Sequence, residues 1–560
     1  MNGMAIMLFA IVAVVAGYAC YGKFLEKTWG IDDKRPTPAV ALKDGQDYMP
    51  TKRQVVFGHQ FASIAGAGPI NGPIQAAVFG WVPVLLWCLI GGIFIGAVQD
   101  YSSMYASVHN KGKSIGFVIE KYVGKTGKRL FLLFVYLFSI LVVAAFADIC
   151  AKSFGTAVSF TDAVNHSNGQ VATTSVLFIV AAVFLGLLFK KLPDLSSAKN
   201  TVISLVLLVA CIAIGYFCPM TVTVENWRNL VFVYILIASV APVWILLQPR
   251  DYLNSYLLVI MIVAAVLGIV VARPVMNLPA FTGFTASTGS MFPILFVTVA
   301  CGAVSGFHSL VSSETASKQV SKESDMLPIS YGAMLLEVVL GVISLVAAGS
   351  VASSTGALPA GTPQVIFAGA VAGFLQKIGL PDALSFELIS LAVSAFALTS
   401  LDSVARVGRL SWQELFFSSD SEGKESGLVK VVSNKWVATL LVLIPGYLLS
   451  LGGYGQIWAL FGSSNQLLSV LALSAVAVYL RRSGRKYRMM LLPMFFMLLV
   501  TLTALVQTVL KNFSVIAAKG PSLAPVMQNT LAILLIGLAI VVAVSCYKKL
   551  FSKQVEAIAE

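Results

Sequence analysis

Charged side chains are scarce in this 560-residue sequence. Only 11% of its residues are Asp, Glu, Lys or Arg, whereas soluble domains carry about a quarter. Hydrophobic residues make up 58% of the chain, and its mean hydropathy is +0.87. Runs of roughly 20 apolar residues, the length that a helix needs to cross a bilayer, recur from end to end. The composition excludes a soluble globular protein and predicts an all-α, polytopic transmembrane helix bundle, with the lipid bilayer as its first partner.

Residue types that bind metals or form disulfides are also few. The sequence has four His and seven Cys, contains no CxxC pair, and places most of its cysteines inside apolar runs. Such cysteines are typical of small core residues, so neither a zinc site nor a disulfide framework is predicted. The GxxxxGK[ST], HExxH and nucleophile-elbow motifs do not occur. We therefore expect no enzyme, no ATP-driven pump, no cofactor and no bound metal.

The positions of the basic residues predict a topology. When successive loops alternate between the two sides of the membrane, all but six of the 38 Lys and Arg fall on one side, which the positive-inside rule makes cytoplasmic. This sorting accounts for the net charge of +13 without a nucleic-acid partner, and places the N-terminus outside and the C-terminus inside a bacterial inner membrane. It uses about fifteen spans, at roughly 4–21, 57–80, 83–108, 129–150, 172–190, 200–219, 229–248, 255–273, 291–316, 329–352, 384–403, 436–452, 457–480, 490–510 and 528–547.

The second span contains its own helix breakers. It reads FGHQFASIAGAGPINGPIQAAVFGW, and its Gly and Pro residues between positions 66 and 73 are incompatible with a continuous helix. Transporters use broken helices at the bilayer midplane to bind anions at a half-helix N-terminus. The alternative is a turn between two short packing helices. The predicted substrate contacts are Gly66, Gly68, Asn71, Gly72 and Gln75, with His59 as a proton-sensitive neighbour.

Counting spans from the second one suggests an inverted repeat. Five spans cover 57–219 and five more, which begin on the opposite side, cover 229–403. We expect residues 57–403 to form a transporter core, 1–56 an N-terminal helix and basic loop, and 404–560 the C-terminal helices. The break in the second span would then face its inverted partner near Ala241–Pro242.

Other polar residues inside the spans divide between packing and function. Gly302 and Gly306 predict a close-packed helical face; alternatively, Ser312 and Ser313 coordinate a small cation against carbonyls freed in the second span. Glu337, deep in an apolar run, is the first candidate for ion coupling, because a buried carboxylate can carry a proton. Gating or capping residues are expected at Asp100, Arg250, Asp251 and Asp402. Two further groups stay open between structural and functional roles, namely His308 and the polar stretch Ser463–Gln466.

Several motifs together resemble the carbon starvation protein A family. They are GHQFASIAGAGPINGPIQAA, GAVQDYSS, QPRDYLN, CGAVSGFHSLVSSETASKQ, TSLDSVARVGR and FGSSNQLL, in the order of that family. Glu314 departs from its usual pattern, where a small residue would follow the paired serines. The resemblance implies a bacterial plasma-membrane transporter, induced on nutrient limitation, that takes up peptides or, in some members, pyruvate with protons. It also implies kinship with the amino-acid transporter superfamily and its LeuT-like fold.

These observations converge on a secondary active transporter for small carboxylate-bearing nutrients on carbon starvation, most of all peptides. A pyruvate/proton symporter is the alternative substrate class. A membrane-embedded sensor or a passive channel is the alternative of another kind. The coupling ion is expected to be a proton or sodium, and the sequence leaves the oligomeric state open.

Overall fold

The computed structural model describes residues 2–44, 48–191, 197–242, 245–353, 356–416 and 427–552. Within these ranges eleven helices are long and apolar enough to cross a membrane, and the strands are β1 (Thr285–Ala286) and β2 (Gly289–Ser290). The long helical segments include α1 (Gly3–Ala16), which continues through a π segment (Gly17–Gly22) into α2 (Lys23–Trp29), then α9 (Lys125–Phe154), α10 (Asp162–Lys191), α11 (Ser197–Phe217), α13 (Leu247–Ala272), α16 (Ala333–Val351), α18 (Asp382–Phe416), α21 (Tyr454–Arg482), α22 (Leu491–Lys519) and α23 (Leu523–Phe551).

Each of the fifteen predicted runs overlaps helical residues, and the run 229–248 extends past α12 to residues 243–244, which lie outside the described ranges. Eleven lie on the long helices. The remaining four correspond to two short helices, α12 (Val224–Val240) and α20 (Lys435–Ser450), and to two interrupted helices. The segment predicted to be too short to cross forms α17 (Pro363–Gln376). The polytopic helical bundle is confirmed, whereas the exact number of spans stays a prediction.

The second predicted span is broken, as its Gly and Pro content indicated. It forms α4 (Arg53–Ile64) and α5 (Gly68–Ala76), with Ala65–Ala67 outside any helix. Pro69 lies in the first turn of α5, where its missing N–H is not needed. The helix then continues through Pro73, so the break is shorter than the run of Gly and Pro residues.

A second interruption lies where the sequence predicted a helical packing face. The ninth span forms α14 (Met291–Thr298) and α15 (Phe307–Glu314), and residues 299–306 between them are not helical. The interpretation of Gly302 and Gly306 as one helical face was therefore wrong. Glycine is favoured both where the backbone leaves a helix and where two helices pack closely. The spacing of Gly302 and Gly306 alone does not distinguish a helix break from a packing face.

Two stretches of the chain share one order of elements. A broken helix (α4–α5) is followed by a helix with a π segment (α6, Trp81–Gly91; Gly92–Gly96; α7, Ala97–Val108), a short helix (α8, Ile115–Tyr122) and long α9. The same order recurs in α14–α15, a π segment (Leu327–Gly332) with α16, short α17 and long α18. This order favours pairing 53–154 with 291–416, and not 57–219 with 229–403 as the sequence suggested.

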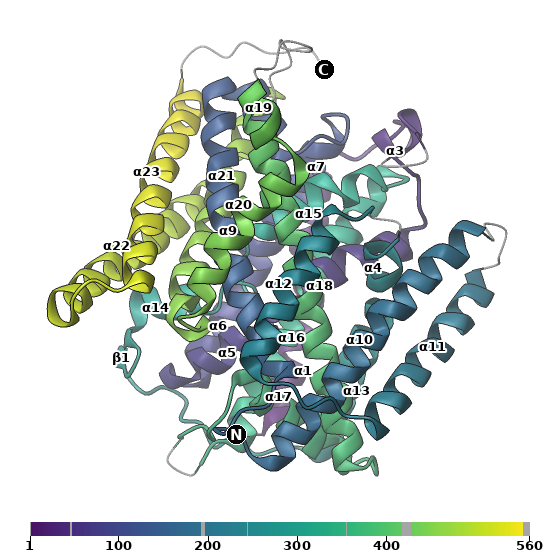
Figure 1. Cartoon of the computed structure of the whole chain (residues 1–560). Helices are drawn as coiled ribbons and strands as arrows, with labels where there is room; N and C mark the ends of the chain where they lie inside the picture. The colour runs from purple at the N-terminus through teal and green to yellow at the C-terminus, as the bar shows by residue number, and fades with distance from the viewer. Residues whose placement is uncertain are drawn as a thin grey trace.

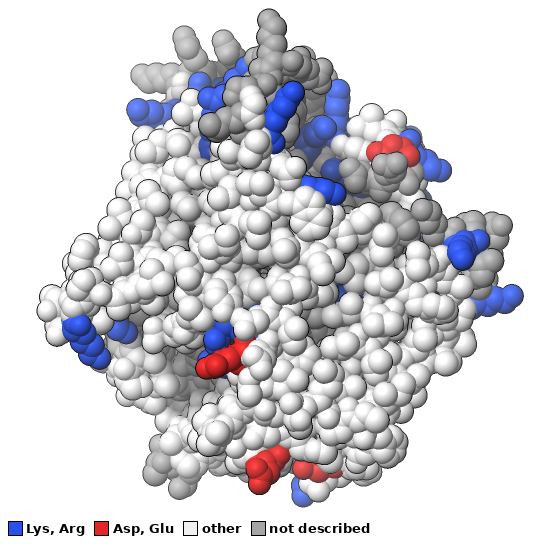
Figure 2. Space-filling view, in the orientation of Figure 1, with Lys and Arg blue, Asp and Glu red and all other residues white. Residues whose placement is uncertain are grey.

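The two long helices that end these stretches, α9 and α18, pack along each other in the middle of the bundle. Helices α22 and α23 lie at one edge in Figure 1, and α10 and α11 lie at the opposite edge. The chain begins at the lower end, and α23 ends at the upper end, where α19 (Gly427–Val432) also lies. Figure 2 shows Lys and Arg gathered at that upper end, above a largely uncharged band. This is the end that the topology prediction makes cytoplasmic.

Candidate functional site

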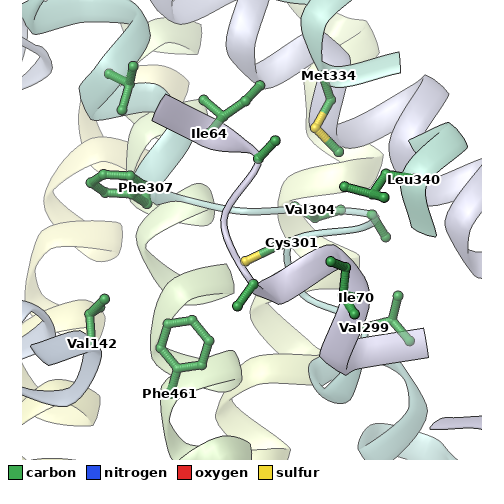
Figure 3. Close-up of a cluster of buried hydrophobic side chains, with 14 of the residues drawn as sticks. Ile64, Ile70, Val142, Val299, Cys301, Val304, Phe307, Met334, Leu340 and Phe461 are labelled. Carbon is green, nitrogen blue, oxygen red and sulfur yellow. The ribbon is translucent and has the colours of Figure 1, made fainter. Parts of the chain in front are cut away.

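A small cavity lies between the two helix breaks and the central helices. Its lining combines phenyl rings and aliphatic groups with a few polar groups. It comprises Ile64 and Gly66 at the first break, Cys301, Ser305 and Phe307 at the second, Phe138, Val142 and Phe146 from α9, Ser400 and Val404 from α18, and Phe461 and Asn465 from α21. Figure 3 shows the two non-helical segments passing beside each other, with Cys301 between them. None of these described lining residues is charged.

Two glycines of α5 let its backbone approach the second break. A Cβ atom at Gly68 would overlap the Cys301 side chain, and one at Gly72 would lie 2.7 Å from the Thr298 carbonyl oxygen. Both contacts are too close for any side chain larger than hydrogen. The break that faces α5 is therefore residues 299–306, and the predicted partner near Ala241–Pro242 was wrong.

The second break is fixed by side chains from two other helices. Asn465 on α21 accepts the Phe307 N–H through Oδ1 (3.0 Å) and donates through Nδ2 to Ser305 Oγ (3.0 Å). Its own carbonyl accepts the Gly306 N–H (2.9 Å). From α7, Gln99 Nε2 donates to the Ser305 carbonyl (2.7 Å). These bonds satisfy backbone groups that the helix break leaves without helical partners.

The structure places the six predicted substrate contacts in different surroundings. Gly66 lines the cavity, and Gly68 and Gly72 support the close packing already described. Asn71 is fully buried on α5, and neither its Nδ2 nor its Oδ1 has a hydrogen-bond partner in the described part of the chain. Gln75 lies one turn further along the same helix.

His59, the sixth predicted contact, lies on α4 away from the cavity lining. Its Nδ1 is 4.0 Å from Asp251 Oδ2. The predicted proton-sensitive neighbour of the substrate is thus beside a gating candidate. Its role is not tested by this geometry.

Three buried ionisable residues meet beside the second break. His308 on α15 has Nδ1 3.2 Å from Asp100 Oδ2 on α7 and Nε2 3.3 Å from Glu337 Oε2 on α16. All three side chains are at most 1% exposed. The sequence singled out Glu337 and Asp100 for separate roles, and the structure brings them to opposite sides of one imidazole.

The other gating candidates form a second cluster. Asp402 on α18 accepts hydrogen bonds from Arg250 on α13 and from the Tyr234 hydroxyl on α12 (2.9 Å). Arg250 also donates to the adjacent Asp251 (2.8 Å) and to Tyr234 (3.0 Å). Arg406 donates to carbonyls at the end of α12. The side chains of Arg250 and Asp402 are 1% and 0% exposed. The sequence predicted that Arg250 pairs with a nearby acidic residue, and the structure adds a second acidic partner, Asp402, which lies 152 positions away in the sequence.

A third charged cluster ties the start of α12 to α9. Asp148 lies 2.8 Å from Arg228 and 2.8 Å from Lys152, and it accepts the Tyr454 N–H (2.8 Å). The Asp148 side chain is fully buried. Helix α12 therefore contacts one charged cluster near each of its ends.

The two serines proposed for a cation lie on α15. Ser312 Oγ accepts from Gln60 Nε2 of α4 (2.7 Å), and both serines are buried. In the part of the chain that the structure describes, no group of three or more His, Cys, Asp or Glu side chains is arranged to hold a metal ion. The role of Ser312 and Ser313 stays a prediction.

Sequence reasoning missed several cavity residues. Phe138, Phe146 and Ser400 lie in runs whose apolar pattern is that of any buried helix. Asn465 carried a usable signal, since it is the central polar residue of FGSSNQLL. The structure gives it both of the roles that the sequence left open, interhelical hydrogen bonding and cavity lining.

A scan against family models matches residues 2–357 and 350–504 to the family described as carbon starvation protein CstA. The peptide transporter CstA of Bacillus subtilis is 31% identical, with coverage of 98% of this chain and 97% of that protein. The peptide transporter CstA of Escherichia coli is 32% identical over 90% of this chain and 80% of that protein. The pyruvate/proton symporter BtsT of Escherichia coli is 31% identical over 86% and 78%. Both substrate classes thus occur among relatives of similar identity.

Among solved structures, MhsT in complex with L-phenylalanine aligns with a TM-score of 0.49 at 13% identity, covering 90% of this chain and 99% of that chain.

Proposed function

The chain belongs to the carbon starvation protein CstA family, and on that premise we propose that it takes up small carboxylate-bearing nutrients, peptides first, as a secondary active transporter. The observation that carries this proposal is the pair of helix breaks, Ala65–Ala67 and residues 299–306, that border one cavity. Broken helices that face each other at membrane depth provide backbone groups for a polar solute where lipid cannot.

The cavity suits a carboxylate held by neutral donors. The N-terminus of α5 begins at Gly68, next to the cavity, and its positive dipole end favours an anion. Ser305, Ser400 and Asn465 add polar side chains. Phenyl rings of α9 and α21 form the apolar part of the lining and fit the uncharged remainder of a small peptide.

Pyruvate is the second candidate, and one observation favours it. The cavity has a volume of about 20 Å³, roughly the space of one water molecule. It must expand for either substrate, and pyruvate requires the smaller expansion. The relative named pyruvate/proton symporter supports the same alternative.

The remaining parts of the proposal concern membrane and energy source. We place the chain in the bacterial plasma membrane with its N-terminus outside and its C-terminus in the cytoplasm, following the distribution of Lys and Arg. A gradient of protons or sodium drives uptake, and no resident cofactor takes part. The charged clusters around Arg250 and Asp148 then serve as the contacts that close the two ends of the path.

Uptake into proteoliposomes tests the proposal. Purified protein is reconstituted, and accumulation of labelled pyruvate is compared with that of a labelled dipeptide, with and without an inward proton or sodium gradient. Accumulation above equilibrium of one compound, lost when the gradient is collapsed, is the expected result. Equilibration without accumulation would indicate a channel. No flux of either compound under any gradient would contradict the proposed cargo and would favour a sensor.

A further inference from the structure

We propose that Asp100, His308 and Glu337 form a buried binding site for one proton that is coupled to the substrate cavity through α15. The proposal rests on the transporter function above and deepens it, because it names the coupling ion and the residues that hold it. The three side chains come from three different helices, α7, α15 and α16. Binding at this site therefore acts on how these helices are held together.

The arrangement of the imidazole determines what the site can hold. Each ring nitrogen faces a carboxylate, Nδ1 toward Asp100 at 3.2 Å and Nε2 toward Glu337 at 3.3 Å. An imidazole whose two nitrogens both face anions is stable with a proton on each nitrogen. The resulting imidazolium offsets one of the two carboxylates, and one negative charge remains in a fully buried place. A single further proton on a carboxylate makes the group neutral.

The carboxylates have unused capacity for that proton. Neither oxygen of Glu337 nor the Oδ1 of Asp100 has a hydrogen-bond partner in the described part of the chain. The ion-pair contact with His308 Nε2 at 3.3 Å is thus the one favourable contact of the Glu337 carboxylate among the described residues, and a buried carboxylate with so little compensation is costly as an anion and acceptable as an acid. Glu337 is thus the group that gains the proton, its carboxylate taking up one H⁺ to become a carboxylic acid, and the reverse step returns the H⁺ to water.

No other charged group compensates the site. Among the described residues, the electrostatic partners of His308 are Glu337 and Asp100 alone, and the further titratable group that interacts with Glu337 is the Cys301 thiol of the second break. Helices α1, α4, α5, α6, α8, α13, α17 and α21, which pack against α15 or α16, bring no charged side chain of the described residues within ion-pair distance of the site. The charge of the site is therefore set by its own three members.

The geometry also favours a proton over sodium. Hard cations such as sodium require several converging oxygen ligands. Here the imidazole lies between the carboxylates and occupies the space that a shared cation would take.

Two direct links join this site to the cavity. His308 follows Phe307, whose N–H is held by Asn465 and whose ring lines the cavity. Asp100 follows Gln99, which donates to the Ser305 carbonyl. A change in the attraction that holds His308 between α7 and α16 moves the segment that carries Ser305 and Phe307. Proton binding and cavity shape are coupled through a few consecutive residues.

Alkylation of Cys301 by a membrane-permeant maleimide tests the proposal without any substrate. Cys301 lines the cavity, and the exposed Cys20 and Cys218 are first replaced by serine. Thiolate chemistry alone changes the labelling rate about tenfold per pH unit below the thiol pKa. In reconstituted protein with the intact triad, the labelling rate of Cys301 should depart from this simple pH dependence, because the site gains or loses its proton and changes the shape of the cavity. E337Q, in which the side chain cannot ionise, should follow the simple dependence.

The matched control is E387Q. Glu387 on α18 is also fully buried, and its two carboxylate oxygens also have no hydrogen-bond partner among the described residues, but it lies outside the triad. It should keep the pH dependence of the unsubstituted triad. H308Q serves as the second test variant if E337Q does not yield folded protein, and it should also lose the departure.

The result that overturns the proposal is a labelling profile that E337Q and H308Q leave unchanged, or a simple thiol profile in the protein with the intact triad. Uptake measurements separate this failure from that of the proposed function. If the labelling profile depends on Glu337 while neither pyruvate nor dipeptide accumulates, the proton site stands and the cargo is wrong. If a substrate accumulates with a proton gradient in E337Q as in the unsubstituted protein, the cargo stands and the proton site is wrong.

Discussion

Removal of the Asp402 carboxylate would test whether the buried charged cluster of α12, α13 and α18 stabilises the fold. Asp402 is 0% exposed and accepts from both Arg250 and Tyr234. In D402N the guanidinium of Arg250, 1% exposed, keeps only Asp251 as an anionic partner. Removal of one partner of a buried ion pair costs about 3–5 kcal/mol. Because Asp251 remains 2.8 Å away, we expect a loss of about 3 kcal/mol, the lower end of that range.

The assay is unfolding by sodium dodecyl sulfate in mixed micelles, with the free energy of unfolding compared between variants. The matched control is E26Q, which removes the Lys23–Glu26 pair at 2.7 Å, whose Lys is 54% exposed. An exposed pair contributes about 0–1 kcal/mol, so E26Q should change little. If D402N destabilises the protein no more than E26Q does, the reasoning from burial is refuted. Y234F removes one hydrogen bond to the same carboxylate and one from Arg250, and it should cost about 1.5–3 kcal/mol, the range for hydrogen bonds to charged groups.

Two further predictions concern the contact between the helix breaks. G68L should abolish uptake and lower the free energy of unfolding by about 1–3 kcal/mol, because its side chain would overlap Cys301. The control is G373A, which has nothing within 4 Å of the added Cβ and should leave uptake intact. Equal uptake by both variants would contradict the packing argument. N465A leaves the Phe307 N–H without its acceptor and should cost about 1–3 kcal/mol together with most uptake. S464A, which removes only a hydrogen bond to a carbonyl of its own helix, is the control. A thermal unfolding scan of both variants checks the prediction, because only N465A should lower the unfolding temperature clearly.

Much of this architecture could be predicted from the sequence because the signals are local. A bilayer imposes a minimum length on every apolar run, so composition alone locates the helices. Gly66, Gly68 and Pro69 within a few residues favour a helix break, and the first break lies where they predicted it. Family motifs add the same information over longer segments.

The counterpart of that break could not be predicted, because its signal is ambiguous. Gly302 and Gly306 are four residues apart, a spacing that serves a packed helical face and an interrupted helix equally well. Pro242 meanwhile suggested a break, and the structure has the end of a continuous helix there, after Val240. The order of elements favours a second half of the repeat that starts at α14 instead of α12, and the layout of the repeat stays a prediction.

The charged sites show a second limit. Asp100 and His308 lie 208 positions apart, and each is unremarkable in its own run. Only the packing of α7, α15 and α16 turns three single ionisable residues into one group. The sequence identified Glu337 and Asp100 as costly residues, but their shared imidazole requires the fold.

The way α12 is held at both ends has a consequence for the electrical properties of the membrane. From Arg228, which contacts Asp148, to Ala241, whose carbonyl is held by Arg406, the helix rises about 20 Å at 1.5 Å per residue. The hydrocarbon core of a bilayer is about 30 Å thick. Where α12 crosses the bilayer along its normal, at least one of the two charged clusters lies below the membrane surface, within the hydrocarbon layer. If water reaches both clusters, the insulating layer here is nearer 20 Å than 30 Å, and the transmembrane voltage falls across that shorter distance as a steeper field.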